Sequence, residues 1–236
     1  MRPRLVKPSK SNDEVVSRRP RLTDGGLYYE MAEPFMKEYI SSGCQLLDCA
    51  LGGGWPLGRI SNVVGDKSTG KTLIAIEAAA NFMKTFIMGE VYYVEAEAAF
   101  DLKYARSLGM NVDKVHFVDA IYTVEDVFEH LSKVLRGLTR DKDREYVPVL
   151  YIIDSLDALS DAAELKRGID EGSYGASKAR KLSELFRRIV QELERKRVHL
   201  MIISQIRDNI GVMFGKKYSR SGGRALDFYA SQIVYL

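Results

Sequence analysis

The stretch "ISNVVGDKSTGKT", residues 60–72, decides which fold we expect. Its first five residues form a β-rich run, and "GDKSTGKT" (65–72) matches the phosphate-loop pattern G-x-x-x-x-G-K-[ST]. A helix-forming segment begins at Lys71, so the pattern stands in the strand–loop–helix context that phosphate binding requires. The alternative is a chance glycine turn, which this context disfavours.

Each residue type in this loop has a chemical reason to bind ATP. Glycines let the backbone curl so that its N–H groups face phosphate oxygens, and the following helix adds its positive end. Lys71 would reach the β- and γ-phosphates, and the Thr72 hydroxyl would ligate Mg²⁺. The ATP-binding candidates are Gly65, Asp66, Lys67, Ser68, Thr69, Gly70, Lys71 and Thr72.

Outward from this loop, β-rich runs alternate with helical patterns. The predicted strands include "EVYYVE", "KVHFV", "VPVLYIID" and "HLMIIS". The predicted helices begin near Lys71 and Leu102, cover "TVEDVFEHLSKVLRGL" (123–138), and span roughly 176–197. Near-continuous apolar strands that alternate with helices predict an α/β fold, a mainly parallel β-sheet flanked by helices.

The first 40 residues differ in composition from the rest. We expect a basic amino-terminal arm over residues 1 to about 25, then a helix in "LYYEMAEPFMKEYI" (27–40), ahead of a core at 41–236. Residues 1–22 carry a net charge of +5; because the whole chain carries +3, the remainder carries −2. This remainder is therefore not generally basic, and a polyanion site there must be a local patch.

Several classes of protein are disfavoured by composition. Two cysteines, Cys44 and Cys49, are too few for a disulfide framework, and three scattered histidines disfavour a His/Cys metal site. No apolar run is long enough to cross a bilayer, and no secretory signal follows the basic amino terminus. We expect a cytoplasmic protein with no membrane partner.

ATP hydrolysis requires carboxylates in addition to the phosphate loop. Asp154 ends the apolar strand "VLYIID", at the sheet edge where ligands bind, and is the candidate for Mg²⁺; alone it could equally be a cap or turn residue. Glu95 and Glu97 follow another strand. Glu97 lies further past the strand end and is the preferred general base, with Glu95 as the alternative or a solvated rim acid.

A second unusual segment is "KKYSRSGGR" (216–224), which is basic, contains two adjacent glycines, and follows the apolar "IGVMFG" (210–215). An exposed apolar residue such as Ile210 could wedge between bases, while cations attract phosphates and glycines allow close backbone approach. The alternative is an ordinary solvated surface loop.

These features together resemble the RecA family of recombinases, particularly its bacterial and phage branches. The resemblance runs from about Ser41 to Tyr235 and rests on the phosphate loop and five further segments. These are "SSGCQLLDCALGGGWPLGRI", "EAEAAFDLKYARSLG", "IIDSLDALS", "SQIRDNIGVMFG" and "SGGRALDFYAS". It implies a RecA-type phosphate-loop NTPase core with two DNA-binding loops, at 167–180 and about 209–225.

The resemblance also implies roles for individual residues. Glu97 matches the catalytic glutamate, Gln205 the glutamine that senses the γ-phosphate, and Asp101 and Tyr104 residues that contact adenine. Phe228 matches an aromatic that packs on the neighbouring subunit; alternatively it is an ordinary core phenylalanine. The DNA-binding candidates are Tyr174, Arg180, Ser183, Arg187, Ile210, Lys216, Lys217, Arg220, Gly222, Gly223 and Arg224.

The implied function is an ATP- and Mg²⁺-dependent recombinase. It would bind single-stranded and duplex DNA, self-associate into a filament or ring, hydrolyse ATP when bound to DNA, and promote homologous pairing and strand exchange. The alternative is a non-catalytic ATP-binding partner that regulates or loads another recombinase. The chain stops at "SQIVYL", inside an expected strand where the family continues, so we expect either a truncated chain or a reduced relative.

Overall fold

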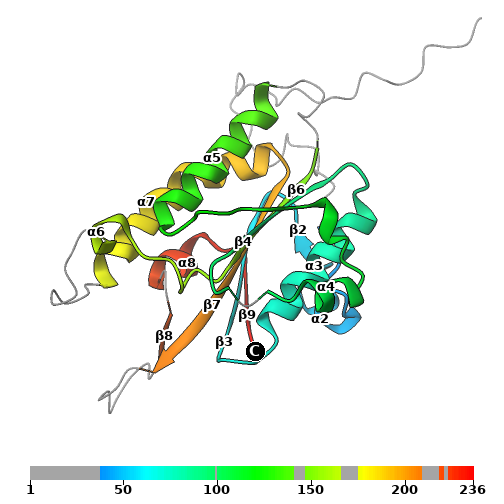
Figure 1. Cartoon of the computed structure of the whole chain (residues 1–236), viewed down its shortest axis with the longest axis horizontal. Coiled ribbons are helices and arrows are strands. Elements are labelled where there is room, and N and C mark those ends of the chain that lie inside the picture. The colour runs from blue at the N-terminus through cyan, green and yellow to red at the C-terminus, as the bar shows by residue number, and fades with distance from the viewer. Residues whose placement is uncertain (1–37, 99, 141–146, 166–174, 209–217, 221–222) are drawn as a thin grey trace, which may run out of the picture. The chain divides into compact units, whose positions relative to one another are not determined.

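In the computed structural model of the chain, the described residues form a seven-stranded sheet, built mainly from the apolar runs of the sequence (Figure 1). The structure describes residues 38–98, 100–140, 147–165, 175–208, 218–220 and 223–236. Neighbouring strands follow the order β5-β4-β6-β7-β3-β9, with β8 beside β7. They are β3 (Ile60–Gly65), β4 (Glu90–Glu95), β5 (Val115–Phe117), β6 (Val149–Asp154), β7 (Val198–Asp208), β8 (Tyr218–Arg220) and β9 (Gln232–Tyr235).

The pairings along the path from β5 to β9 are all parallel, whereas β8 pairs antiparallel with β7. Every residue of β3 and of β6 is buried, as expected for parallel strands covered on both faces. The predicted fold class, a mainly parallel sheet flanked by helices, is therefore confirmed.

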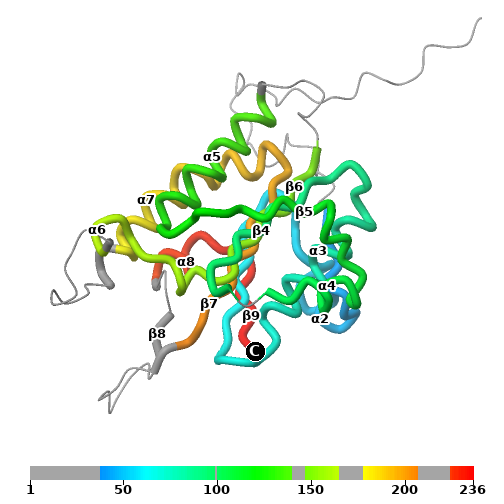
Figure 2. The backbone as a smooth tube through the Cα atoms, in the orientation of Figure 1, coloured from blue at the N-terminus to red at the C-terminus, as the bar shows by residue number. Residues whose placement is uncertain are grey.

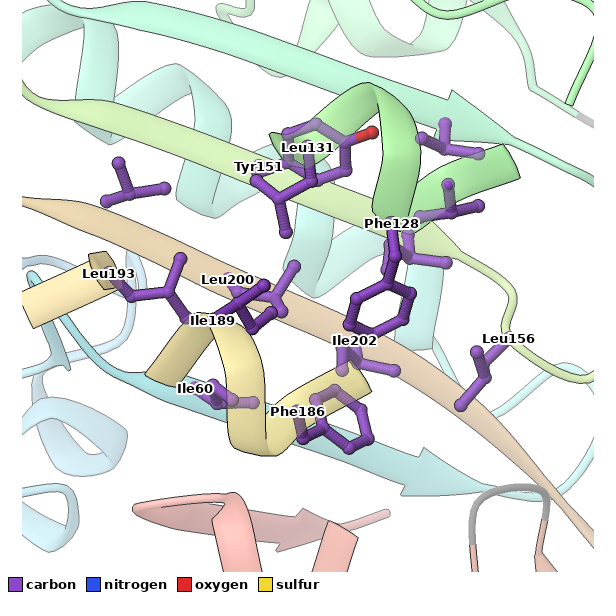
Figure 3. Packing of buried hydrophobic residues seen from close by; sticks show 14 of the residues in the cluster. Ile60, Phe128, Leu131, Tyr151, Leu156, Phe186, Ile189, Leu193, Leu200 and Ile202 are labelled. Carbon is purple, nitrogen blue, oxygen red and sulfur yellow. The ribbon is translucent and has the colours of Figure 1, made fainter. Parts of the chain in front are cut away.

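Helices cover both faces of this sheet (Figures 1 and 2). Alternate residues of β6 enter different clusters: Tyr151 and Ile153 join one, Leu150 and Ile152 the other. Figure 3 shows the first cluster, where Phe128 and Phe186 face the strands. The covering helices are α5 (Val124–Arg140), α7 (Gly175–Arg195) and α8 (Gly223–Tyr229) on this face, with α3 (Lys71–Thr85) and α4 (Leu102–Ser107) on the other.

The start of the described chain differs from the expectation. The helix expected over 27–40 lies mainly outside the described residues, and its last two residues form the strand β1 (Tyr39–Ile40). This strand pairs antiparallel with β2 (Trp55–Pro56). The remaining short helices are α2 (Gln45–Ala50), η1 (Val112–Lys114) and α6 (Ala162–Leu165). Within the part of the chain that is described, no helix is both long and apolar enough to cross a membrane.

The segment predicted as one loop, about 209–225, contains regular structure. Strand β7 continues to Asp208 instead of ending near Ser204, and β8 pairs with this extension, Ile206 opposite Arg220. Helix α8 begins at Gly223. The expectation of a continuous loop was wrong here because the extended β7 exposes backbone N–H and C=O groups that a second strand can pair. Residues 209–217 and 221–222 lie outside the described residues.

Candidate active site

The parallel register brings the predicted site residues to one edge of the sheet. Gly65, at the end of β3, is paired with Gln205 of β7. Glu95, at the end of β4, is paired with Asp154 of β6. Because all four strands run in the same direction, their carboxyl ends meet the loop between β3 and α3, whose turn is visible in Figure 2.

The loop from residue 65 to 72 has the tight curl that the pattern predicts. Gly70 adopts φ +92°, in the left-handed region that favours glycine, immediately before α3. A Cβ atom on Gly65 would lie 2.5 Å from the Thr69 hydroxyl, so a side chain there would force the Thr69 side chain to move. The Thr69 hydroxyl also donates to the Asp66 carbonyl at 3.0 Å, and the Lys67 N–H to the Asp66 carboxylate at 2.7 Å. Residues 66–69 are exposed.

Lys71 is the buried cation of this loop. Lys71 is the first residue of α3 and is only 8% exposed. Its Nζ donates to the Asp66 carbonyl oxygen at 2.5 Å. The ammonium group is therefore held across the loop, beside the helix amino terminus. Both features favour an anion at this position.

Asp154, the candidate metal ligand, is buried close to Tyr93 and Thr72. The Tyr93 hydroxyl donates to Asp154 Oδ2 at 2.8 Å, and the Thr72 hydroxyl lies close enough to the Asp154 side chain to lower the pKa of that carboxyl. Burial raises the pKa of Asp154, hydrogen bonds from Tyr93 and Thr72 oppose this rise, and the charges of Glu97 and Glu95 add to it. Burial also raises the pKa of Tyr93, so its hydroxyl stays a donor.

Glu97 and Gln205 are in direct contact. Gln205 Nε2 donates to Glu97 Oε1 at 2.6 Å, and the Ser155 hydroxyl donates to the same oxygen. Glu97 is exposed, whereas Glu95 is partly buried at the end of β4. The structure thus brings the preferred base to the γ-phosphate-sensing candidate, while Glu95 stays beside Asp154.

The two adenine-contact candidates lie at the start of α4. Asp101 caps this helix, because its Oδ1 accepts the N–H groups of Lys103 at 2.8 Å and Tyr104 at 3.1 Å. Tyr104 is 46% exposed, so part of the residue is accessible to a ligand. Their role in adenine contact stays a prediction.

Three residues of the site were not identified from the sequence: Tyr93, Ser155 and Asp157. Tyr93 donates to Asp154, Ser155 to Glu97, and the Asp157 carboxylate accepts the Gln205 N–H at 2.7 Å. Asp157 had a weak signal, since it closely follows Asp154. Tyr93 lies within an apolar strand, and only its hydroxyl group could have suggested a role in the site.

The DNA-binding candidates on α7 share its outer side. Arg180 and Arg187 are exposed and Ser183 is half-buried, whereas Leu182 and Phe186 between them are buried. Their spacing of three, four and seven residues places them along one stripe of the helix.

The remaining candidates are near α8 or outside the described residues. Arg224 is exposed in the first turn of α8, which begins at Gly223, and Arg220 belongs to β8. Phe228 is 79% exposed and meets Tyr229 edge-on, so it is not the core phenylalanine of the alternative interpretation. Tyr174, Ile210, Lys216, Lys217 and Gly222 lie outside the described residues.

A parallel sheet with a phosphate loop after β3 and acids at the ends of β4 and β6 defines a phosphate-loop α/β core of the RecA type. The family model for the RecA N-terminal domain matches residues 30–235. The chain belongs to the RecA family.

Individual relatives agree with this assignment. Protein RecA of Streptomyces venezuelae is 37% identical over 195 residues, 82% of this chain and 48% of that protein. Protein RecA of Petrotoga mobilis is 35% identical over 193 residues, 81% and 49% respectively. Protein RecA of Clostridium perfringens is 35% identical over 203 residues, which are 86% of this chain and 54% of that protein. The chain thus spans about half the length of the curated relatives it matches.

Proposed function

We propose that the chain is an ATP-dependent recombinase that binds single-stranded DNA, forms filaments and promotes homologous pairing and strand exchange. The observation that carries the proposal is the hydrogen bond between Gln205 and Glu97. It joins the proposed catalytic base to β7, the strand that leads into the proposed second DNA loop. A nucleotide-dependent change at Glu97 would therefore reach the DNA-binding segment directly.

The residues at the phosphate loop fit ATP with Mg²⁺. The Thr72 hydroxyl and the Asp154 carboxylate supply neighbouring oxygen donors, which are the ligands that Mg²⁺ prefers. Among the described residues, no group of three or more His, Cys, Asp or Glu side chains could hold a metal ion. This donor set suits Mg²⁺, which commonly uses one or two protein carboxylates and takes other ligands from substrate phosphates and water.

Each residue then has a distinct task. Lys71 and the backbone of the 65–72 loop would bind the phosphates, while Thr72 and Asp154 would hold Mg²⁺, which would supply positive charge beside the phosphates. Glu97 would accept a proton from the attacking water. Gln205 and Ser155 orient the Glu97 carboxylate through its Oε1, which leaves Oε2 for that proton.

DNA would bind along α7 and the β7–β8 region. The exposed Arg180 and Arg187 provide local positive charge in a chain whose residues 23–236 carry a net charge of −2. The exposed ring of Phe228 supports self-association, since a large aromatic side chain that is 79% exposed gains stability when a neighbouring subunit covers it.

The test separates binding from chemistry at Glu97. In Glu97→Gln the amide oxygen still accepts from Gln205 and Ser155 but no longer acts as a base. Binding of ATP and of labelled single-stranded DNA should persist, while DNA-stimulated phosphate release falls by about a hundredfold or more. Glu95→Gln is the matched control and should retain turnover.

Each contrary result has a defined meaning. Loss of turnover in Glu95→Gln but not in Glu97→Gln would assign the base to Glu95. A parent protein that binds ATP without hydrolysing it in the presence of DNA would support the non-catalytic partner instead.

A further inference from the structure

The turn that follows β6, residues 155–160, contacts the candidate active site through two side chains. The Ser155 hydroxyl donates to Glu97 Oε1, and Asp157 Oδ2 accepts the N–H of Gln205 at 2.7 Å. Ser155 is fully buried and Asp157 is 8% exposed, so water does not compete freely for these bonds. Movement of Glu97 or Gln205 would therefore displace the turn.

Lys178 of α7 forms hydrogen bonds with the same turn. Lys178 Nζ donates to the carbonyl oxygens of Leu156 at 2.9 Å and Leu159 at 2.5 Å. An ammonium group has only donors, and its bonds to carbonyls are charge-assisted, so one side chain holds two points of the turn. Leu156 is also buried in the cluster that contains Phe186 of α7, as Figure 3 shows.

Lys178 lies near the amino-terminal end of α7, in the first turns of the helix and two residues before Arg180. Further along, the buried Leu182 and Phe186 pack against the sheet and fix the helix there. The hydrogen bonds from Lys178 to the turn therefore act on the amino-terminal end of α7, which carries the DNA-binding candidate Arg180.

We propose that Lys178 is a positioning residue that transmits the nucleotide state from the 155–160 turn to α7. The path runs from Glu97 through Ser155 to the turn and from the turn through Lys178 to the helix, with Asp157 adding a branch from Gln205. This inference rests on the proposed function in that α7 is taken to contact DNA. Lys178 itself is assigned no contact with nucleotide or DNA.

The first experiment needs no DNA. Hydrogen–deuterium exchange of the first turns of α7 is measured with Mg²⁺ and a non-hydrolysable ATP analogue, and without nucleotide. The parent should show a nucleotide-dependent change in exchange, and Lys178→Met, which keeps an apolar stem but no charge, should lose it. Analogue affinity should stay within about twofold, because Lys178 does not line the phosphate loop.

Two further variants make the result specific. Lys181→Met is the matched control, since Lys181 lies one turn further along α7 and pairs with Glu184 at 3.7 Å on the surface; it should respond like the parent. Lys178→Gln retains a neutral donor and should keep part of the response. It also serves as the test variant if Lys178→Met does not fold, as judged by circular dichroism.

The second experiment measures coupling to DNA. The ratio of single-stranded DNA affinities with and without the ATP analogue should fall about tenfold in Lys178→Met and stay at the parent value in Lys181→Met. A full exchange response in either Lys178 variant would overturn the proposal, as would a parent whose α7 does not respond to nucleotide. If the exchange results hold but the parent binds no DNA, the proposed function fails and the link between turn and helix stands.

Discussion

The Tyr93 hydroxyl offers a sharp test of how Asp154, the proposed Mg²⁺ ligand, is held. Tyr93→Phe removes one oxygen from a fully buried side chain and leaves its ring among Phe100 and Phe117. The lost bond is the 2.8 Å donation to Asp154 Oδ2. Because Asp154 is only 6% exposed, water cannot readily replace the donor.

The expected magnitude follows from these contacts. A buried hydrogen bond to a charged group contributes about 1.5–3 kcal/mol. About 1.4 kcal/mol corresponds to a tenfold change in affinity, so the Mg²⁺-dependent part of nucleotide binding should weaken by about 10- to 100-fold. The same range is typical when a residue that orients a metal ligand is removed.

The assay is a Mg²⁺ titration of fluorescent ATP-analogue binding, repeated with EDTA to obtain the metal-free affinity. The metal-free affinity should be unchanged, since Tyr93 does not line the phosphate loop. Tyr151→Phe is the matched control: Tyr151 is equally buried on the neighbouring strand, but its hydroxyl is 2.9 Å from Nδ1 of His130. An unchanged Mg²⁺ requirement in Tyr93→Phe, or an equal loss in Tyr151→Phe, would refute the reasoning.

Two further predictions concern the phosphates of ATP and of DNA. Lys71→Ala should abolish or strongly weaken ATP binding by removing the cation at the β- and γ-phosphates, and unchanged affinity by calorimetry would contradict that assignment. Replacing four basic residues with alanine should make the logarithmic salt dependence of single-stranded DNA binding shallower by about 0.7 per lost contact, up to about 3, with ATP affinity retained. Fluorescence anisotropy across a salt series measures this, and an unchanged slope would argue against DNA contact. The four residues are Lys216, Lys217, Arg220 and Arg224.

The sequence predicted the parts of this protein that depend on local order. The 65–72 pattern between a strand and a helix identifies the phosphate loop, because its geometry requires glycine and lysine at fixed spacing. The alternation of apolar strands and amphipathic helices predicted the parallel sheet, because a chain that buries strands on both faces needs helical crossovers. It also placed Asp154 and Glu95 at strand ends.

The sequence did not predict where the chain departs from simple periodicity. The extension of β7 to Asp208 and its pairing with β8 depend on which backbone groups of β7 are left unpaired beyond Gln205, where its pairing with β3 ends. The same holds for β1, which forms only because residues 55–56 lie beside it in the folded chain. Neither pairing has a signal in composition, because backbone groups are the same in every residue but proline.

Tertiary structure alone decided how the site residues contact one another. Three hydrogen bonds join residues that are far apart in the sequence. Tyr93 and Asp154 are separated by 61 positions, Ser155 and Glu97 by 58, and Asp157 and Gln205 by 48. These contacts require a particular strand order and register, and a shift of one residue would turn strand side chains such as Tyr93 and Asp154 to the opposite face. The sequence thus determined which chemical groups the chain carries, while the packing of β4, β6 and β7 determined which of those groups bond to one another.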